Sequence, residues 1–201
     1  MDEDTVHDIH SKNPFAVFAP QPTGVAFESL AKREKIILLL RAHPVTLVPT
    51  ILSVVFLAAA PTLVPSILSI LDIDIFSSFS VRQLILMTVF WYLFTWGYAF
   101  YKFIIWYFNV YLLTNERIID IDFRGLLHKE TSFAHLNQIQ DVNPKIIGFF
   151  GTLFHFGNVF IQTAAEKPEF EFSFIERPNE VAREILEQVN KESKEAPGQV
   201  E

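Results

Sequence analysis

The sequence predicts an α+β membrane protein in which a two-helix transmembrane hairpin is followed by an antiparallel β domain that a C-terminal helix closes off. The apolar stretches Val45–Leu71 and Gln83–Tyr101 contain no charged residue. At about 1.5 Å of rise per helical residue, each stretch is long enough to cross a hydrocarbon core of about 30 Å. After Tyr107, apolar and polar residues alternate in short runs, which is the period of strands with one buried face.

The residues before the hairpin divide into a tail and a partly basic segment. Residues 1–23 begin acidic and then carry prolines without periodicity, which predicts a flexible acidic tail. No Lys or Arg precedes Asp8, so we do not expect a signal peptide, and both spans should persist. The apolar run Val25–Leu40 is interrupted by bases, which predicts an interfacial helix before the membrane. The expected divisions are 1–23 for the tail, 24–107 for the pre-membrane helix and both spans, 108–191 for the β domain and 192–201 for a second tail.

Basic residues flank the outer ends of the hairpin, where they could contact lipid headgroups. These candidate residues are Lys32, Arg33, Lys35, Arg41 and Lys102. The connection Asp72–Arg82 carries acids at Asp72 and Asp74 instead. By the positive-inside rule, both termini and the β domain are expected in the cytoplasm, with two spans in the plasma (inner) membrane. The alternative is that these bases only set the topology.

The first span contains Pro61 and Pro65. Each proline removes an intrahelical donor, so the helix is expected either to kink or to end early near Pro61. A kinked helix can line a transport path, which makes a small transporter or channel subunit an alternative function. Proton and ion pathways normally need ionisable groups within the membrane, and neither apolar stretch contains one. The sequence therefore favours an anchor.

Strand periodicity marks the segments Arg117–Phe123, Val159–Thr163 and Phe170–Phe174. In the first and last of these, the residues expected on one apolar face are Ile119, Ile121, Phe123, Phe170, Phe172 and Phe174. After Pro178 the apolar residues return to helical spacing, which predicts an amphipathic helix that covers the sheet. Its expected apolar stripe is Val181, Ile185, Leu186 and Val189.

The segment Ile146–Phe156 is too apolar for an ordinary surface loop. The sequence favours a segment that fills the core of the domain. The alternative is that it touches the membrane or a partner. The residues that would form this interaction segment are Phe149, Phe150, Phe154 and Phe156.

Composition and spacing exclude several classes of function. The chain has no cysteine, so disulfides, thiolate metal sites and cysteine nucleophiles are excluded. Asp120 and Asp122 share a predicted strand face without further ligands, and the histidines of the domain lack the helical spacing of a zinc site. Neither a nucleophile elbow nor a phosphate loop is present, so we expect no cofactor and no enzymatic activity. The net charge of −7 argues against nucleic-acid binding.

Four short motifs, in this order and spacing, resemble the bacterial pleckstrin-homology-like (PH-like) domain of the YdbS/YdbT type. They are Leu113–Ile119, Gly125–Leu127, Ile139–Val142 and Gly157–Ala164. In that family two transmembrane helices precede the domain, and an Arg-Pro pair like Arg177-Pro178 precedes the terminal helix. The resemblance covers about Glu34–Val189, and it implies a PH-like antiparallel β barrel capped by a C-terminal helix without enzymatic activity. Where the family often has a base before its glycine, this chain offers only His155, which weakens the case for an anion site there.

These observations predict a non-enzymatic, membrane-anchored interaction module that holds a PH-like β barrel at the cytoplasmic face of the membrane. Its expected partners are membrane lipids, through the two spans, and an unidentified membrane protein or a second copy of the chain. A membrane-surface lipid-binding module is a further alternative. Acids outnumber bases between Asn115 and Lys191, so any attraction to anionic lipid should come from the bases beside the spans.

Overall fold

A computed structural model gives the fold of the chain. It describes residues 15–22, 34–125, 128–164 and 169–195. The chain forms two compact units, which we call the helical hairpin and the β unit. The helical hairpin is Val45–Trp106, and the β unit combines Met1–Pro44 with Tyr107–Glu201. The sequence predicted a β domain made only of residues 108–191, so the contribution from the chain before the hairpin is a correction.

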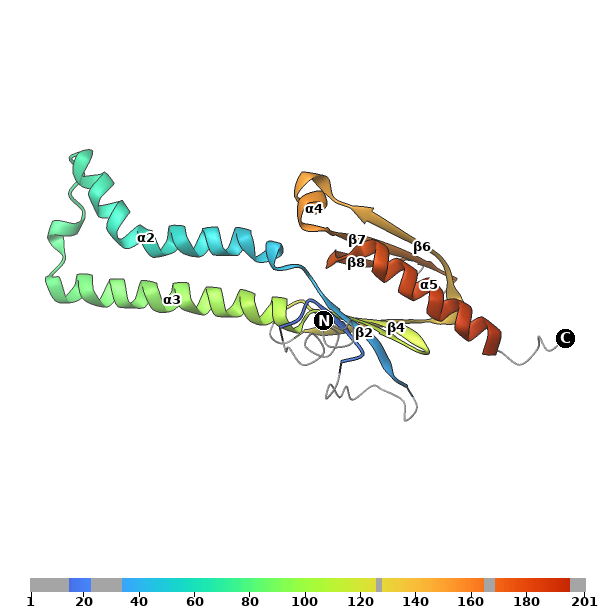
Figure 1. The fold of residues 1–201 in the computed structure, drawn as a ribbon. Helices are drawn as coiled ribbons and strands as arrows, with labels where there is room; N and C mark the ends of the chain where they lie inside the picture. The colour runs from blue at the N-terminus through green and yellow to red at the C-terminus, as the bar shows by residue number, and fades with distance from the viewer. Residues whose placement is uncertain (1–14, 23–33, 126–127, 165–168, 196–201) are drawn as a thin grey trace, which may run out of the picture. The chain divides into compact units, whose positions relative to one another are not determined.

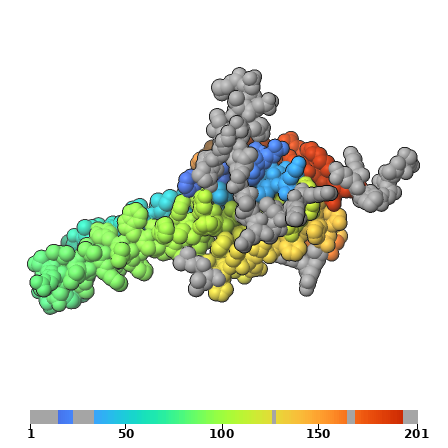
Figure 2. Space-filling model, turned by 90° about the horizontal axis from the view of Figure 1, so that it is seen from below, coloured from blue at the N-terminus to red at the C-terminus, as the bar shows by residue number. Residues whose placement is uncertain are grey.

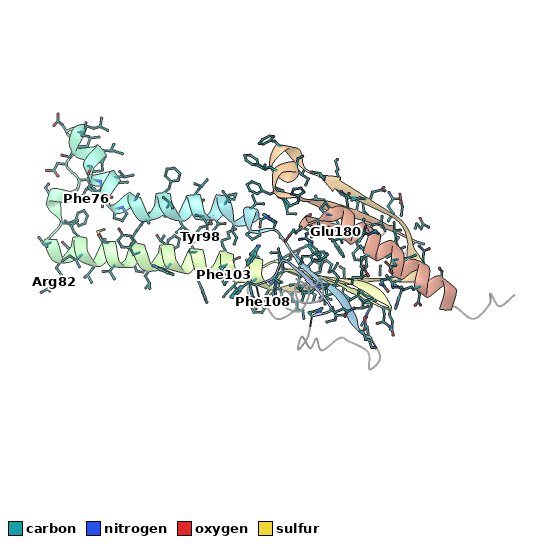
Figure 3. All side chains as sticks on the ribbon, viewed as in Figure 1. Phe76, Arg82, Tyr98, Phe103, Phe108 and Glu180 are labelled. Carbon is teal, nitrogen blue, oxygen red and sulfur yellow. The ribbon has the colours of Figure 1, made fainter. Side chains whose placement is uncertain are left out.

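The helical hairpin consists of two long helices and a short connection (Figure 1). A 3-10 turn η1 (Pro44–Leu47) leads into α2 (Val48–Ile70), and α3 spans Val81–Phe108. A second 3-10 turn, η2 (Phe76–Ser78), lies in the connection. Figures 1 and 2 show α2 and α3 side by side. Apart from Thr95, no residue of these two helices is buried, and many of their large apolar side chains are exposed; Figure 3 shows side chains projecting from both helices.

Helix α2 continues through both of its internal prolines. Pro61 and Pro65 lie inside a helix that ends at Ile70, and Figure 1 shows its axis bending towards the connection. The predicted kink is therefore confirmed, and the alternative of an early end near Pro61 is wrong. A helix can pass through proline when neighbouring groups bond the backbone carbonyls that proline leaves open.

Side chains of α3 donate to one such carbonyl and to the carbonyl next to it. Pro61 has no amide hydrogen to give to the carbonyl four residues before it, which belongs to Leu57. The Nε1–H of Trp91 donates to that Leu57 oxygen at 2.7 Å. The hydroxyl of Tyr92 donates to the adjacent carbonyl of Ala58 at 3.2 Å. The kink in one helix is thus stabilised by two aromatic donors of the other.

The strands of the β unit form two antiparallel sheets. The first sheet has the order β1-β2-β3-β4-β5, and the second has the order β6-β7-β8. The bounds of the first five strands are Phe18–Pro20, Ile36–Arg41, Val110–Thr114, Arg117–Phe123 and Lys129–His135. The bounds of the last three are Ile139–Ile146, Phe156–Thr163 and Glu169–Glu176. The 3-10 turn η3 (Leu136–Gln138) joins the sheets, α4 (Gly148–Phe154) connects β6 to β7, and α5 (Pro178–Glu195) packs on β6 and β7.

The helical hairpin is inserted between two neighbouring strands. Arg41 at the end of β2 pairs with Val110 at the start of β3. The chain therefore leaves the first sheet at the end of one strand and returns beside it to begin the next. In an ordinary antiparallel pair a short turn occupies this place.

The strands β2, β3 and β4 of the first sheet are buried on both faces. One face belongs to a core that includes Leu38, Leu40, Leu113, Ile118, Phe170, Phe172, Val181 and Ile185, drawn from both sheets and α5. The other face carries a second cluster of Ala16, Ala19, Leu39, Val110, Leu112, Ile119 and Ile121, with Phe123 partly buried against it. The predicted shared face of Ile119, Ile121 and Phe123 is confirmed, as is the α5 helix after Pro178.

Two predictions about the start of the domain are wrong. A pre-membrane helix was expected over Val25–Leu40, but the structure has strand β2 from Ile36 onward. Apart from Glu34 and Lys35, the earlier part of that range lies outside the described residues. The run Ile36–Leu40 is apolar at every position because β2 is buried on both faces, and such a run looks the same in a strand as in a helix. The expected tail contains β1, whereas residues 1–14 lie outside the described part of the chain.

The predicted closed barrel is also not observed. The two sheets have separate hydrogen-bond ladders, joined by an isolated bridge between Ala42 and Ile175. What the structure shows is an α+β fold with antiparallel sheets and, within the described residues, four α-helices. Two individual side chains also differ from prediction. Phe174, with a positive φ of 53°, is 38% exposed instead of sharing the buried face, and Leu186 of α5 is 42% exposed.

Candidate functional site

Helix α4 carries a surface of large apolar side chains outside the core of the β unit. Phe149, Phe150, Leu153 and Phe154 are 76%, 62%, 56% and 50% exposed. We call these four residues the α4 apolar surface. The sequence favoured a segment that fills the core, and this is wrong for α4. Of the predicted interaction residues, only Phe156, which begins β7, is buried.

The backbone around α4 holds this surface outward. Gly148 is the first residue of α4 and has a φ of 62°, and His155 follows the helix in the left-handed conformation. Gly151 faces inward and is buried, because a Cβ there would lie 2.8 Å from the carbonyl oxygen of Phe156. A Cβ on Gly157 would collide with the carbonyl oxygen of Lys145. Glycines therefore let α4 lie close against the strand ends while its bulky residues face away.

The α4 apolar surface lies at the end of the β unit where the chain leaves for the helical hairpin. His43 follows β2, and its amide donates to the carbonyl of Phe174 in β8 at 2.6 Å. Its imidazole stacks on Phe156, with ring centroids 5.2 Å apart, and lies 6.5 Å from the ring of Phe154. Burial lowers the pKa of His43, and the nearby carboxylate of Glu176 opposes this shift. A member of the α4 apolar surface thus lies beside the residue that precedes Pro44.

Charged groups near α4 are mostly basic. No Asp or Glu occurs between Asp141 and Glu166, whereas Lys145 and His155 flank the helix and are exposed. The nearby carboxylate of Glu176 has a partner in Arg177, at 3.4 Å. The segment is therefore apolar and slightly basic within an acidic chain.

Of the predicted headgroup residues, Lys35, Arg41 and Lys102 lie in the described part of the chain. Lys32 and Arg33 lie outside the described residues. Lys35 precedes β2, and at about 3.3 Å per residue the strand separates it by about 25 Å of chain from His43. Lys102 lies in α3 with its amine 6.0 Å from the ring centre of Tyr98. Contact of Lys35 or Lys102 with lipid headgroups stays a prediction.

Arg41 has a structural environment within the β unit. Arg41 is 9% exposed. Its Nη1 donates to the carbonyl of Ala16 and its Nε donates to the carbonyl of Tyr107, each at 3.0 Å. Its guanidinium carbon also lies 4.7 Å from the centre of the Tyr107 ring. Desolvation lowers the pKa of Arg41, and interaction with Tyr107 opposes this effect. Arg41 therefore joins the segment before β1 to the chain that returns from the hairpin, and little of it is accessible to lipid.

Sequence reasoning missed a buried ion pair in the first sheet. Arg117 donates to both carboxylate oxygens of Glu34 at 2.9 Å, and the Thr114 hydroxyl donates to the same carboxylate at 2.8 Å. The Glu34 side chain is fully buried, and its hydrogen bond is the main cause that raises the pKa of Arg117. The groups satisfy one another, so this is a structural pair that ties the start of β2 to β4. No group of three potential metal ligands occurs among the described residues.

Comparisons with known proteins give one weak structural similarity. No family model matches the sequence, and no curated protein matches it. The chain is similar to a DUF1696 family protein with a pleckstrin-homology domain from Shewanella loihica PV-4, known from a crystal structure. The similarity has 17% identity and a TM-score of 0.29, and it covers 41% of this chain and 68% of that chain. This TM-score is too low to establish a shared fold, so the YdbS/YdbT type of the resemblance stays a prediction.

Proposed function

We propose that the protein is a non-enzymatic, membrane-anchored interaction module. In this proposal the two helices of the hairpin cross the plasma (inner) membrane, and they hold a PH-like β unit at its cytoplasmic face. The observation that carries the proposal is the surface of the hairpin. Pro44–Ile70 and Val81–Phe108 are 27 and 28 residues long. In the most apolar 18-residue stretch of each, 0% and 6% of the residues are buried.

Long apolar helices also occur in the cores of soluble proteins and in signal sequences, and neither case fits this hairpin. A core helix of a soluble protein is mostly buried, whereas these helices expose residues such as Phe56 at 72% and Phe90 at 72%. A cleaved signal sequence is removed together with everything before it. Here β2, before the first helix, pairs with β3, after the second, so cleavage would remove both β1 and β2 from the first sheet.

The same strand pairing supports a topology with both ends of the hairpin on one side. Because β2 and β3 are neighbours in one sheet, the chain between them must cross the membrane an even number of times. Arg82 lies at the connection end of α3 (Figure 3), with Asp72 and Asp74 earlier in the connection. In the sequence, Lys35 precedes the hairpin and Lys102 lies near the end of α3, as the positive-inside rule expects for cytoplasmic flanks.

Cysteine accessibility tests this topology, since the natural chain has no cysteine. Ser77→Cys in the connection and Ser193→Cys in α5 would each be treated in intact cells with a membrane-impermeant maleimide. We expect Ser77→Cys to react in intact cells, and Ser193→Cys to react only after the membrane is opened. Reaction of both cysteines from outside would overturn the cytoplasmic location, and recovery of the protein in the soluble fraction would overturn the anchor.

The interaction role needs a separate experiment. Chemical crosslinking in intact membranes, followed by mass spectrometry, should give reproducible links from the β unit to a membrane protein or to a second copy. A variant with Glu34→Gln and Arg117→Gln, which disturbs the β unit, should lose these links while the hairpin stays in the membrane. If the β unit forms no links above background, the interaction role would be rejected.

A further inference from the structure

We infer that the α4 apolar surface is a second membrane contact, which inserts among the phospholipid headgroups and the first carbons of the acyl chains. This inference rests on the proposed function, because it requires that the helical hairpin is in a bilayer. It goes further by giving the β unit a lipid-binding surface of its own. The fixed lipid contact would add to the two spans and hold the β unit against the membrane.

The first argument for a membrane contact is that α4 lies close to the start of the first candidate span in the chain. The ring of Phe154 is 6.5 Å from the imidazole of His43, and His43 is bonded to Pro44, where the first candidate span begins. The hydrogen bond from His43 to Phe174 and the bridge from Ala42 to Ile175 fix this segment to β8. Phe154 of α4 is therefore held beside the residue that precedes the first candidate span.

The apolar side chains of α4 suit the membrane interface. Interfacial helices lie in the membrane plane and bury their apolar face by about 5–10 Å at the boundary between headgroups and acyl chains. The four large side chains of the α4 apolar surface are exposed, while Gly151 faces the strand ends. They can therefore enter this layer without moving α4 away from the strand ends that hold it.

The composition of the surface favours lipid as the occupant. Four large apolar side chains form its centre, Lys145 precedes α4, and the nearby carboxylate of Glu176 is paired with Arg177. A carboxylate beside the membrane would be repelled by anionic headgroups, whereas a base is attracted to them. The backbone conformation at Gly148 and the close packing at Gly151 hold the apolar side chains outward in the absence of lipid. These features match a surface that anionic phospholipids cover.

Site-specific fluorescence on the full chain tests the inference. Three single-cysteine variants, Leu153→Cys in α4, Leu186→Cys in α5 and Phe56→Cys in α2, would carry an environment-sensitive label. Leu186 is the matched control, because it is an exposed leucine of the same unit that lies outside the α4 apolar surface. Each labelled protein would be reconstituted into vesicles of phosphatidylcholine and phosphatidylglycerol, with and without bromine on the acyl chains. Aqueous iodide serves as the opposite quencher.

We expect brominated lipid to quench the labels at positions 153 and 56 by about twofold or more, and to leave the label at 186 nearly unchanged. Iodide should quench position 186 the most. If position 56 is quenched and 153 behaves like 186, the second contact is refuted while the anchor stands. If position 56 is not quenched, the anchor itself is refuted. Protection of 153 from both quenchers would show that protein covers α4, and would also refute the inference.

A second labelling site guards against a variant that fails to fold. Phe149→Cys replaces the most exposed member of the α4 apolar surface, at 76%. A label there should be quenched by brominated lipid as at position 153. Full iodide quenching at both positions, in vesicles where position 56 is quenched by bromine, would reject the membrane contact.

Discussion

Replacing Phe172 with alanine should destabilise the β unit far more than the same replacement of Phe174, two residues along the same strand. Strand alternation alone treats these phenylalanines as equivalent. In the structure Phe172 is fully buried and stacks on Tyr111, with ring centroids 4.5 Å apart. Phe174 is 38% exposed, and its backbone has a positive φ that alanine would also have to adopt. The pair therefore compares a core position with a partly exposed one at constant chemistry.

The magnitude follows from burial. Loss of a fully buried phenylalanine side chain costs about 3–5 kcal/mol, of which stacking on Tyr111 accounts for about 0.5–1.5 kcal/mol. Since each 1.4 kcal/mol is a factor of ten, amides of the core strand β7 that exchange by global opening should exchange about 150 to 5,000 times faster in Phe172→Ala. Phe174→Ala should cost about 1 kcal/mol or less, which is at most about a sixfold change.

Hydrogen exchange followed by mass spectrometry is the appropriate assay, on the full chain in detergent or nanodiscs. Tryptophan fluorescence would not report on this core, because all three tryptophans, Trp91, Trp96 and Trp106, belong to the helical hairpin. Peptides from α3 serve as an internal control and should exchange at the same rate in both variants. Equal acceleration of β7 by the two substitutions would refute the assignment of Phe172 to the core and Phe174 to the surface.

Three further expectations follow from the hairpin and the core. Replacing Val45–Trp106 by a short Gly/Ser linker should give a folded, soluble β unit, since the linker only has to join neighbouring strands; an unfolded product by circular dichroism and gel filtration would contradict this. Trp91→Phe should destabilise the hairpin by about 0.6–1.7 kcal/mol in a steric-trapping assay, because it removes the donor to the Leu57 carbonyl. The loss should be much smaller in a Pro61→Ala background, where residue 61 regains an amide for that carbonyl. Equal losses in both backgrounds would argue against the hydrogen bond. Burial raises the pKa of Tyr111 from 10.0 to about 12, so the free energy of unfolding should be unaffected by this group below pH 10 and should fall as the pH rises from 10 to about 12. Tyr111→Phe should abolish this fall between pH 10 and about 12 when the free energy of unfolding is measured by urea denaturation at each pH; the same fall in the variant would contradict the assignment.

Periodicity predicted the elements whose two faces differ in environment. Helix α5 was found in this way because one of its faces is exposed to solvent. The shared face of Ile119 and Ile121 was found because it packs in a different hydrophobic cluster from the opposite face of the strand. Strand β2 was predicted as a helix since burial on both faces removes the alternation that identifies a strand. The inserted position of the hairpin could not be predicted from the sequence, because pairing between β2 and β3 joins residues that are far apart along the chain.

The candidate site was predicted only in part. The unusual apolarity of Ile146–Phe156 was visible in the sequence, but its exposure depends on where α4 is attached to the strands. The inward orientation of Gly151 decides this, and a glycine in an apolar run gives no sign of which way its neighbours face. The proximity of His43 depends on the bridge between Ala42 and β8, which no local pattern indicates. By contrast, Pro61 by itself implies an open carbonyl at Leu57, and hence the need for a donor such as the one α3 supplies.

The insertion of the hairpin between β2 and β3 also sets the order in which the protein can assemble during translation. When β2 leaves the ribosome, its pairing partner β3 does not yet exist, because residues 42–109 must be synthesised first. At about 5–20 residues per second this delay is about 3–14 s. During that interval Ile36–Leu40, an apolar strand that is buried on both faces in the finished protein, has only β1 available from the first sheet. Insertion of α2 and α3 brings the two strand ends together, so errors in membrane insertion should appear as aggregation of the β unit.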